Sequence, residues 1–234
     1  MILAGGNSSR LGAEKSLLEF EERPLICWTA EKLSLAADEI VVVARDEAHA
    51  RRLEEIIAGS APNLKVEPKI IFTWDSVPGY GPVAGLCAGM RQAHGIFAFA
   101  TGCDLPFLNP QVIERLFELA DGEKSYEAAV PVQPNGFFEP LHSVYHREKM
   151  LLACEQAVKK AERRIHAPLQ NLTVSCVRVE LLLPLDPDLL TFFNLNTRED
   201  LERARALWPD HRARQSKETR ARQPNQSKVK QSRT

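Results

Sequence analysis

The chain alternates between two hydrophobic patterns. Short apolar runs rich in β-branched residues predict strands, and longer stretches in which hydrophobic residues recur every three or four positions predict helices. The predicted strands cover Met1–Ala4, Glu39–Ala44, Lys69–Thr73, Ile96–Ala100, Glu127–Val132 and Thr173–Val179. The predicted helices cover Leu25–Leu35, Asp46–Ala58, Pro82–His94 and Pro110–Asp121.

The order of these elements predicts the fold class. The early strands are almost entirely apolar, which is typical of strands that are covered on both faces. Alternating strands and helices favour an α/β fold with three αβα layers, Rossmann-like, around a mixed and mostly parallel sheet. Right-handed crossovers then bring the carboxyl ends of the parallel strands to one edge of the sheet, where such folds bind ligands.

The pattern changes near the carboxyl terminus. We expect the last helix to begin after Asn196 and to end near Trp208, because hydrophobic residues almost vanish beyond Pro209. A segment with so little apolar surface cannot offset the entropy lost on ordering. Residues 209–234 are therefore expected to form a disordered basic tail, dispensable for activity, after a single domain at residues 1–208. The tail carries a net charge of +6 and the body −7, which together give the net charge of −1.

Composition excludes several classes of protein. The 234 residues are 44% hydrophobic and 26% charged, which is typical of a globular chain. No apolar run approaches the roughly 18 residues of a membrane-spanning helix, and no secretory leader is evident at the start. Five widely spaced cysteines without a CxxC pair argue against structural zinc and fit a reducing cytoplasm. We expect a cytoplasmic protein that contacts no membrane and no nucleic acid, since its body is acidic.

A glycine-rich segment follows the first predicted strand directly. It reads LAGGNSSRLGAEK from Leu3 to Lys15, and its glycines let backbone N–H groups approach an anion closely. Arg10 and Lys15 add two positive charges, which suits a triphosphate. The spacing fits neither a P-loop nor the GxGxxG dinucleotide motif. An ordinary strand-to-helix turn is the alternative, but the combination of glycines with two cations favours phosphate binding.

Acidic and amide residues lie at other predicted strand ends. Asp104 follows the strand Ile96–Ala100, and a hard oxygen ligand beside a triphosphate suits Mg²⁺; the alternative is a carboxylate that caps a turn. Asp75 follows the strand Lys69–Thr73 and, on its own, reads as a turn residue. Asn194 and Asn196 flank Leu195 and share one side of an extended segment, unless Asn196 simply caps the last helix.

The glycine-rich segment resembles the LAGGxSxRMGxDK signature of nucleotidyltransferases with a Rossmann-like glycosyltransferase-A fold, the nucleotide-diphospho-sugar transferase type. It is most similar to the signature of the molybdenum cofactor guanylyltransferases. Four further segments follow in the order of that family, so the resemblance runs from Leu3 to Leu201. They are GYGPVAG at 79–85, CDLP at 103–106, EPLHSVY at 139–145 and FFNLNTREDL at 192–201.

The resemblance implies a role for each matching residue. It makes Arg10, Lys15 and Asp104 catalytic, with Asp104 as the ligand of Mg²⁺, and it places Asn194 and Asn196 at the acceptor. The residues implied to bind the nucleotide are Leu3, Ala4, Gly5, Gly6, Lys15, Asp75, Gly81, Pro82 and Asp104.

The implied activity is the transfer of GMP from GTP to molybdopterin-bound molybdenum cofactor, with release of pyrophosphate. Molybdoenzyme maturation proteins are expected as protein partners. The alternatives are cytidylyl transfer, another small phosphorylated acceptor, or a nucleotide-binding module without catalysis.

Two features depart from the family pattern. Only four residues precede Gly5, so the first strand is short or starts upstream of Met1. The second strand ends Val43-Ala44-Arg45-Asp46, without the asparagine that some members use to bind the nucleotide. The identity of the base, guanine or cytosine, therefore stays open at the level of sequence.

Overall fold

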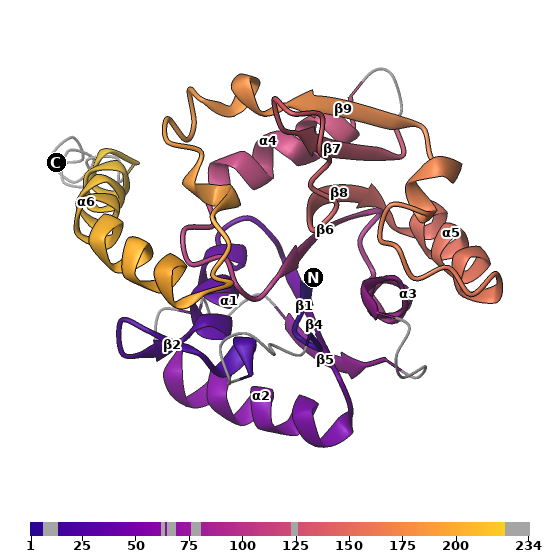
Figure 1. Cartoon of the computed structure of the whole chain (residues 1–234), viewed down its shortest axis with the longest axis horizontal. Helices are drawn as coiled ribbons and strands as arrows, with labels where there is room; N and C mark the ends of the chain where they lie inside the picture. Colours follow the sequence, from indigo (N-terminus) through magenta and orange to yellow (C-terminus); the bar gives the residue numbers. More distant parts are fainter. Residues whose placement is uncertain (7–13, 62–63, 65–68, 76–80, 123–125, 223–234) are drawn as a thin grey trace, which may run out of the picture.

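A computed structural model of the chain describes residues 1–6, 14–61, 64, 69–75, 81–122 and 126–222 (Figure 1). Within this part, seven strands form one sheet in the order β5-β4-β1-β6-β8-β7-β9. All of them are parallel except β8, which is antiparallel to both neighbours, β6 and β7. The prediction of a mixed, mostly parallel sheet is confirmed.

Six of the seven strands lie close to their predicted positions, and β8 is the one that the hydrophobic pattern did not predict. The seven strands are β1 (Ile2–Leu3), β4 (Glu39–Ala44), β5 (Lys69–Trp74), β6 (Phe97–Gly102), β7 (Ala128–Val132), β8 (His142–His146) and β9 (Val174–Arg178). The first strand is short, and its pairing extends through hydrogen bonds from the Ala4 N–H to the Val43 carbonyl and from the Thr101 N–H to the Met1 carbonyl.

The helices include the four that the pattern predicts. These are α1 (Leu25–Leu33), α2 (Glu47–Ser60), α3 (Gly81–Gln92) and α4 (Pro110–Ala120). Two of them begin at side-chain caps, since Asp46 accepts from the His49 N–H and Asn109 accepts from the Gln111 N–H. The hydrophobic periodicity therefore located these helices within a few residues at each end.

Helices cover both faces of the sheet and complete three layers (Figure 1). On one face α1, α2 and α4 pack on alternate strand residues such as Ile2, Val42 and Phe99. On the other face α3 packs with α5 (Arg147–Lys159) against the opposite residues of the same strands, including Val43 and Ala100. Burial on both faces explains why the strands read as continuous apolar runs.

Several short elements were not predicted from the sequence. The hairpin of β2 (Glu19–Phe20) and β3 (Arg23–Pro24) pairs just two residues per strand. The hydrophobic pattern also missed helix α5, although it is long. Its apolar face is narrow, because it buries just four residues: Met150, Ala153, Cys154 and Ala157. The described residues also contain four 3-10 turns: Lys15–Leu17, Pro168–Asn171, Val179–Leu182 and Leu190–Phe192.

The prediction that helix formation ends near Trp208 is wrong. The last helix, α6, begins at Arg198 and continues through Pro209 to Arg222. Its anchor is an aromatic cluster in which Trp208 lies 4.7 Å from Trp28 and 5.1 Å from Phe20 between ring centroids. These partners come from distant parts of the chain, so the local composition did not reveal them. The helix therefore continues past Trp208 to Arg222, and residues 223–234 lie outside the described residues.

Two contacts hold the part of α6 that follows Pro209. The ring of His211 packs 4.9 Å from that of Phe107, and Arg214 pairs with Asp188. They help to offset the hydrogen bond that the helix loses at a proline, which lacks an N–H. None of the helices in the described residues is both long and apolar enough to cross a membrane.

Candidate functional site

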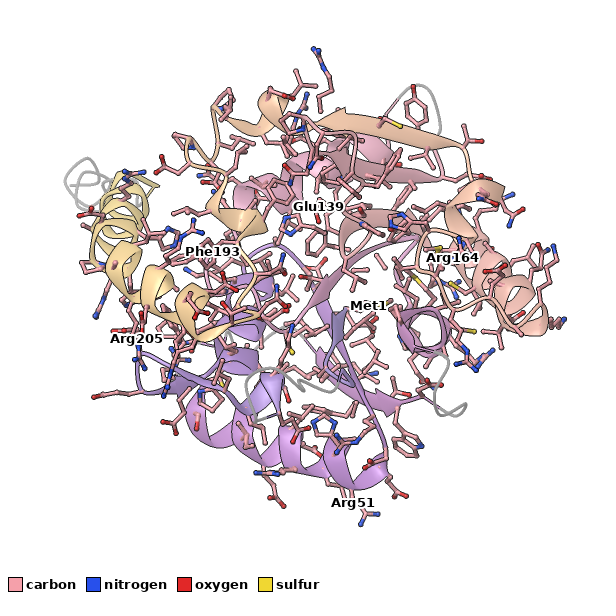
Figure 2. All side chains as sticks on the ribbon, in the orientation of Figure 1. Met1, Arg51, Glu139, Arg164, Phe193 and Arg205 are labelled. Atoms are coloured by element: carbon pink, nitrogen blue, oxygen red, sulfur yellow. The ribbon has the colours of Figure 1, made fainter. Side chains whose placement is uncertain are left out.

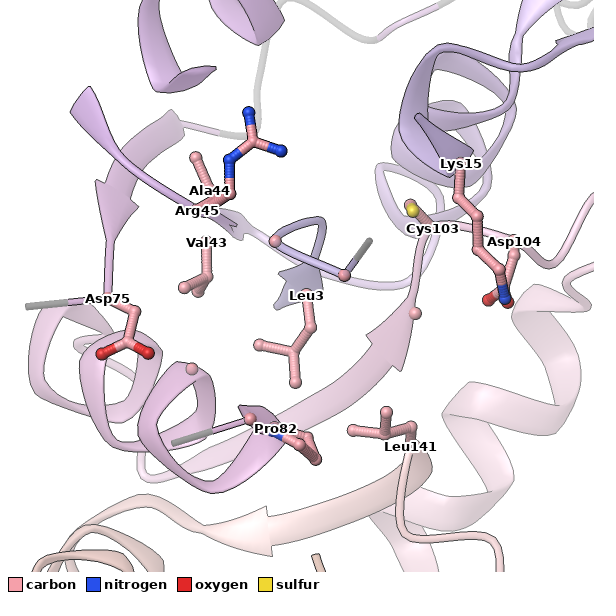
Figure 3. A pocket seen from close by; sticks show the side chains of 15 residues that line it. Leu3, Lys15, Val43, Ala44, Arg45, Asp75, Pro82, Cys103, Asp104 and Leu141 are labelled. Carbon is pink, nitrogen blue, oxygen red and sulfur yellow. The ribbon is translucent and has the colours of Figure 1, made fainter. Parts of the chain in front are cut away.

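A cavity of about 490 Å³ opens at the carboxyl ends of β1, β4, β5 and β6 (Figure 3). This is the edge of the sheet at which the sequence pattern places ligand binding. The lining residues are Leu3, Gly5, Gly6, Lys15, Val43, Ala44, Arg45, Asp75, Gly81, Pro82, Gly85, Gly102, Cys103, Asp104 and Leu141. Most residues implied to bind the nucleotide therefore meet in one place, although Ala4 is buried beside the cavity and does not line it.

Glycines set the shape of this cavity. A Cβ atom on Gly5 would lie 3.3 Å from the backbone of Arg45, and one on Gly85 would lie 3.3 Å from the side chain of Leu3. Gly81 begins α3 with a φ of +64°, which a side chain would disfavour. The missing side chains bring backbone N–H groups and the amino end of a helix to the cavity wall, where an anion is stabilised.

Lys15 joins two other polar residues at one flank of the cavity. Its Nζ donates to Asp104 Oδ2 at 2.8 Å and to Asn196 Oδ1 at 2.5 Å. These three side chains come from the end of the glycine-rich segment, the loop after β6 and the segment that leads into α6. The contact between the Leu195 N–H and the Asp104 carbonyl, at 2.9 Å, brings the last two segments together.

Asp104 is held in place by its neighbours. A Cβ atom on Gly102 would lie 2.5 Å from Asp104 Oδ1, so the carboxylate occupies space that only a glycine leaves open. Its side chain is 15% exposed and faces the Nζ of Lys15. The residue is thus positioned by the backbone on one side and by a cation on the other.

The residues at this flank fit a Mg²⁺ ion. Mg²⁺ takes one or two protein carboxylates and fills its remaining positions with water and phosphate oxygens. Asp104 offers such a carboxylate. The amide oxygen of Asn196 lies nearby, because both oxygens accept a hydrogen bond from Lys15 Nζ. Among the described residues no cluster of three or more His, Cys, Asp or Glu residues could hold a metal by itself, so a single carboxylate beside phosphates is the arrangement that these residues offer.

Asp75 lies on the opposite flank of the cavity from Asp104, across the ends of β1 and β4 (Figure 3). The Asp75 N–H donates to the Ala44 carbonyl at 3.3 Å, which extends the pairing of β5 with β4 by one residue. The structure thus separates the two carboxylates that the sequence singled out. Asp104 lies beside Lys15, whereas Asp75 lies on the side of the cavity where α3 begins.

Asn194 lies outside this cavity, in a second and smaller one. The second cavity has a volume of about 240 Å³ and shares Leu141 with the first. Its lining residues are Leu105, Glu139, Pro140, Leu141, His142, Ile165, His166, Phe192 and Asn194. The two asparagines therefore take different places, since Asn196 faces Lys15 while Asn194 faces the neighbouring cavity.

One predicted catalytic residue cannot be placed. Arg10 lies outside the described residues, as do the other residues from 7 to 13 and residues 79 and 80 of the Gly-Pro loop. The arrangement of the described residues does not depend on them. The described residues bring two cations, two carboxylates and a glycine-lined wall to a single cavity.

The sequence reasoning did not identify several residues of the cavity. Arg45, at the end of β4, lines the cavity, and so does Leu141, which separates the two cavities. Cys103 also lines it, although burial raises the pKa of its thiol and so keeps it neutral and unreactive. The position of Arg45 at a strand end was a usable signal, whereas Leu141 becomes a neighbour of the site only through the antiparallel β8.

Comparison with known proteins shows the family of this chain. Residues 1–174 match the family model described as "MobA-like NTP transferase domain". This chain belongs to that family.

Relatives in this family share most of their length with the chain. A protein of Methanosarcina mazei named "Probable molybdenum cofactor guanylyltransferase" is 36% identical, and the alignment covers 86% of this chain and 87% of that protein. A protein of Natronomonas pharaonis with the same name is 36% identical over 88% of this chain and 95% of its own. The family membership thus rests on nearly the whole domain.

A solved structure of the family confirms the fold. The molybdopterin-guanine dinucleotide biosynthesis protein A of Archaeoglobus fulgidus has a TM-score of 0.74 and 31% sequence identity with this chain. The match covers 89% of this chain and 97% of that protein. The α/β nucleotidyltransferase fold that the sequence predicted is therefore the fold of this MobA-like chain.

Proposed function

We propose that this chain transfers GMP from GTP to the terminal phosphate of molybdopterin-bound molybdenum cofactor and releases pyrophosphate. The observation that carries the proposal is the convergence of Lys15, Asp104 and Asn196 beside a glycine-lined cavity at the sheet edge. The names of the two archaeal relatives support the identity of the nucleotide and of the acceptor.

The transfer requires one bond to form and one to break. A phosphate oxygen of the acceptor attacks the α-phosphorus of GTP in line, and the bond from that phosphorus to the β-phosphate oxygen breaks. The attacking oxygen is already an anion, so no general base is needed. The rate then depends on positioning and on neutralising the charge of the leaving pyrophosphate.

The residues of the cavity can supply both of these effects. The backbone of Gly5 and Gly6 and the amino end of α3 line the cavity and can hold phosphate oxygens. Lys15 exchanges its present partners for the charge that develops on pyrophosphate, and we expect Arg10 to act with it. A Mg²⁺ ion, held by Asp104, supplies further positive charge beside the phosphates when it is bound.

The second cavity is the proposed site of the acceptor. It adjoins the transfer site through Leu141, and the chain runs directly from Asn194 in this cavity to Asn196 beside Lys15. Apolar side chains such as Phe192 and Ile165 can cover a flat ring, while Asn194 and Glu139 offer hydrogen bonds at its edge. Molybdoenzyme maturation proteins remain a prediction from the resemblance alone.

Pyrophosphate release, measured with each of four nucleoside triphosphates, tests this proposal. Each nucleotide is assayed with and without molybdopterin-bound cofactor, and release is expected only with GTP and acceptor together. Release with CTP would indicate a cytidylyltransferase, and release with another phosphorylated acceptor would identify a different substrate. Failure of every pair would contradict catalysis and leave a nucleotide-binding module.

A further inference from the structure

A buried histidine lies behind the wall of the nucleotide cavity. His49, in the first turn of α2, is 3% exposed, and its Nε2 lies 2.6 Å from Oε1 of Glu14. Glu14 is the residue immediately before Lys15. Glu14 Oε1 is buried and makes no hydrogen bond among the described residues, and His49 Nε2 lies closer to it than the Arg45 guanidinium at 3.7 Å.

The hydrogen bonds of His49 fix its tautomer. The Arg45 N–H donates to Nδ1 at 3.1 Å, so Nδ1 is an acceptor and carries no proton. Burial is the largest of the effects on this imidazole and lowers its pKa, which keeps the ring neutral near pH 7. The single ring proton is therefore on Nε2, the atom that lies 2.6 Å from Glu14 Oε1 and 3.5 Å from Ser16 Oγ.

These contacts connect two walls of the cavity. Through Nδ1, His49 holds the backbone at the end of β4, where Arg45 lies 3.3 Å from the position of a Cβ on Gly5. Through Nε2, it holds the residue that precedes Lys15. Two arginines also approach Glu14, with Arg45 Nη1 at 3.7 Å and Arg52 Nη1 at 3.8 Å.

Glu14 places a negative charge close to the proposed polyphosphate site. A carboxylate near a polyphosphate site repels the ligand unless cations compensate for it, and the two arginines provide that compensation. Lys15 has a long side chain that loses considerable entropy when it is held in one conformation. A restraint on Glu14, the preceding residue, limits the motion of the Lys15 backbone. The Lys15 side chain then reaches Asp104 from a fixed starting point.

We propose that Glu14 and His49 are positioning residues, whose close contact holds Lys15 and the end of β4 in register with each other at the nucleotide site. The pair touches neither the reacting phosphorus nor the leaving group. Its role depends on the proposed nucleotidyl transfer, because Lys15 acts in that reaction.

Two substitutions of Glu14 separate positioning from charge. Glu14→Ala removes the carboxylate that contacts His49, and we expect kcat to fall about tenfold or more, since small displacements of a catalytic group are costly. Glu14→Gln keeps a polar side chain of the same size beside Nε2, so its kcat should stay within about threefold of the original. The matched control is Glu47→Ala on the same helix, which removes only the exposed pair with Arg51 and should leave kcat unchanged.

His49→Asn provides an independent check. The amide oxygen of asparagine can replace Nδ1 as acceptor for the Arg45 N–H but cannot reach Glu14. The variant should therefore lose as much kcat as Glu14→Ala, and the double variant should lose no more than either single one, because both remove the same interaction. Additive losses would contradict a shared contact.

A measurement without substrate distinguishes this proposal from the proposed function. Hydrogen exchange at the amides of Leu17 and Leu18, which donate to the Glu14 and Lys15 carbonyls, should be faster in Glu14→Ala than in Glu14→Gln or Glu47→Ala. Equal exchange and equal kcat in all three variants would overturn the positioning role. If no substrate pair releases pyrophosphate, the proposed function fails, while the exchange rates and the affinity for a fluorescent GTP analogue still test the anchor.

Discussion

Asp104 owes its position to a glycine two residues earlier. No side chain at Gly102 intrudes on Asp104 Oδ1, and the same carboxylate pairs with Lys15 through Oδ2. A cation and a carboxylate at this distance hold each other in place until substrate charges compete for both. Substitutions of single residues at this site should therefore affect catalysis strongly and folding little.

Replacement of Asp104 by Asn tests the proposed metal role. The amide keeps the size of the side chain but removes the negative charge that a divalent cation needs, so kcat should fall by about 100-fold or more. Thermal unfolding should change little, because the residue sits at the edge of the cavity. Turnover similar to that of the unsubstituted protein would exclude Asp104 as the metal ligand.

Gly102→Ala should disturb the same carboxylate indirectly. Its Cβ would lie 2.5 Å from Oδ1 and force the Asp104 side chain to rotate. We expect kcat to fall about tenfold with little loss of stability, measured by steady-state kinetics and thermal melting. Gly59→Ala is the control, because no atom lies within 4 Å of its Cβ position in α2. Full activity of Gly102→Ala would show that this rotation does not matter.

Lys15→Ala should reduce kcat/KM more than Arg45→Ala does. Lys15 reaches Asp104 directly, whereas Arg45 lines the cavity with a side chain that is 45% exposed and lies near Glu14. Charge next to the leaving group stabilises the transition state more than charge at the rim of the site. The reverse order of the two effects would argue against placing the leaving pyrophosphate beside Lys15.

At the scale of elements, α6 shows how distant contacts extend a helix. Trp208 inserts between Phe20, Trp28 and Phe107, and His211 continues the contact with Phe107. The residues that follow Pro209 are too polar to form a stable helix alone. In Figure 2, Arg205 of α6 lies at the outer rim of the molecule while Met1 lies near its centre, consistent with a helix that is anchored along only one side.

A chain that ends at Trp208 should remain active but lose stability. The truncation removes the packing of His211 on Phe107, which contributes about 1 kcal/mol, and the exposed pair of Arg214 with Asp188, which adds little. None of the described residues beyond Trp208 lines the first cavity, so kcat should not change. Urea unfolding and pyrophosphate release measure the two effects. A large loss of kcat without unfolding would show that the segment takes part in catalysis.

At the scale of the whole molecule, buried histidines make the fold sensitive to acid. Burial lowers the pKa of His142 from 6.5 to about 3 and that of His211 to about 4, and it also lowers the pKa of His49. Below pH 6.5 these histidines bind protons in the unfolded chain but stay neutral in the folded chain until the pH approaches their lowered pKa values. The stability contributed by these neutral rings is therefore complete above pH 6.5 and decreases as the pH falls.

The free energy of unfolding should thus be lower at pH 5 than at pH 7.5. His142 alone accounts for about 2 kcal/mol of this difference, by linkage between its folded and unfolded pKa values. Denaturant titrations at the two pH values measure it, with His142→Phe as the comparison. If His142→Phe shows the same difference in the free energy of unfolding between the two pH values, His142 does not cause that difference.

The elements and motifs were predictable because their signals are local. A buried strand reads as an apolar run, a helix reads as a period of three to four, and the glycine-rich segment and Asp104 stand directly at strand ends. Since parallel strands end at one edge, even the meeting of Gly5, Asp75 and Asp104 at one cavity followed from the order of elements.

Only the tertiary structure decided which side chains meet across large separations. Lys15 and Asn196 are 181 positions apart, and nothing local predicts their contact. The continuation of α6 depends on aromatic partners from the first third of the molecule and from Phe107. The anchor between Glu14 and His49 likewise joins two segments whose own patterns are unremarkable. The sequence by itself determined the elements and the chemistry at their ends, because those depend on neighbours along the chain. The packing of distant segments fixed the partners of each functional group.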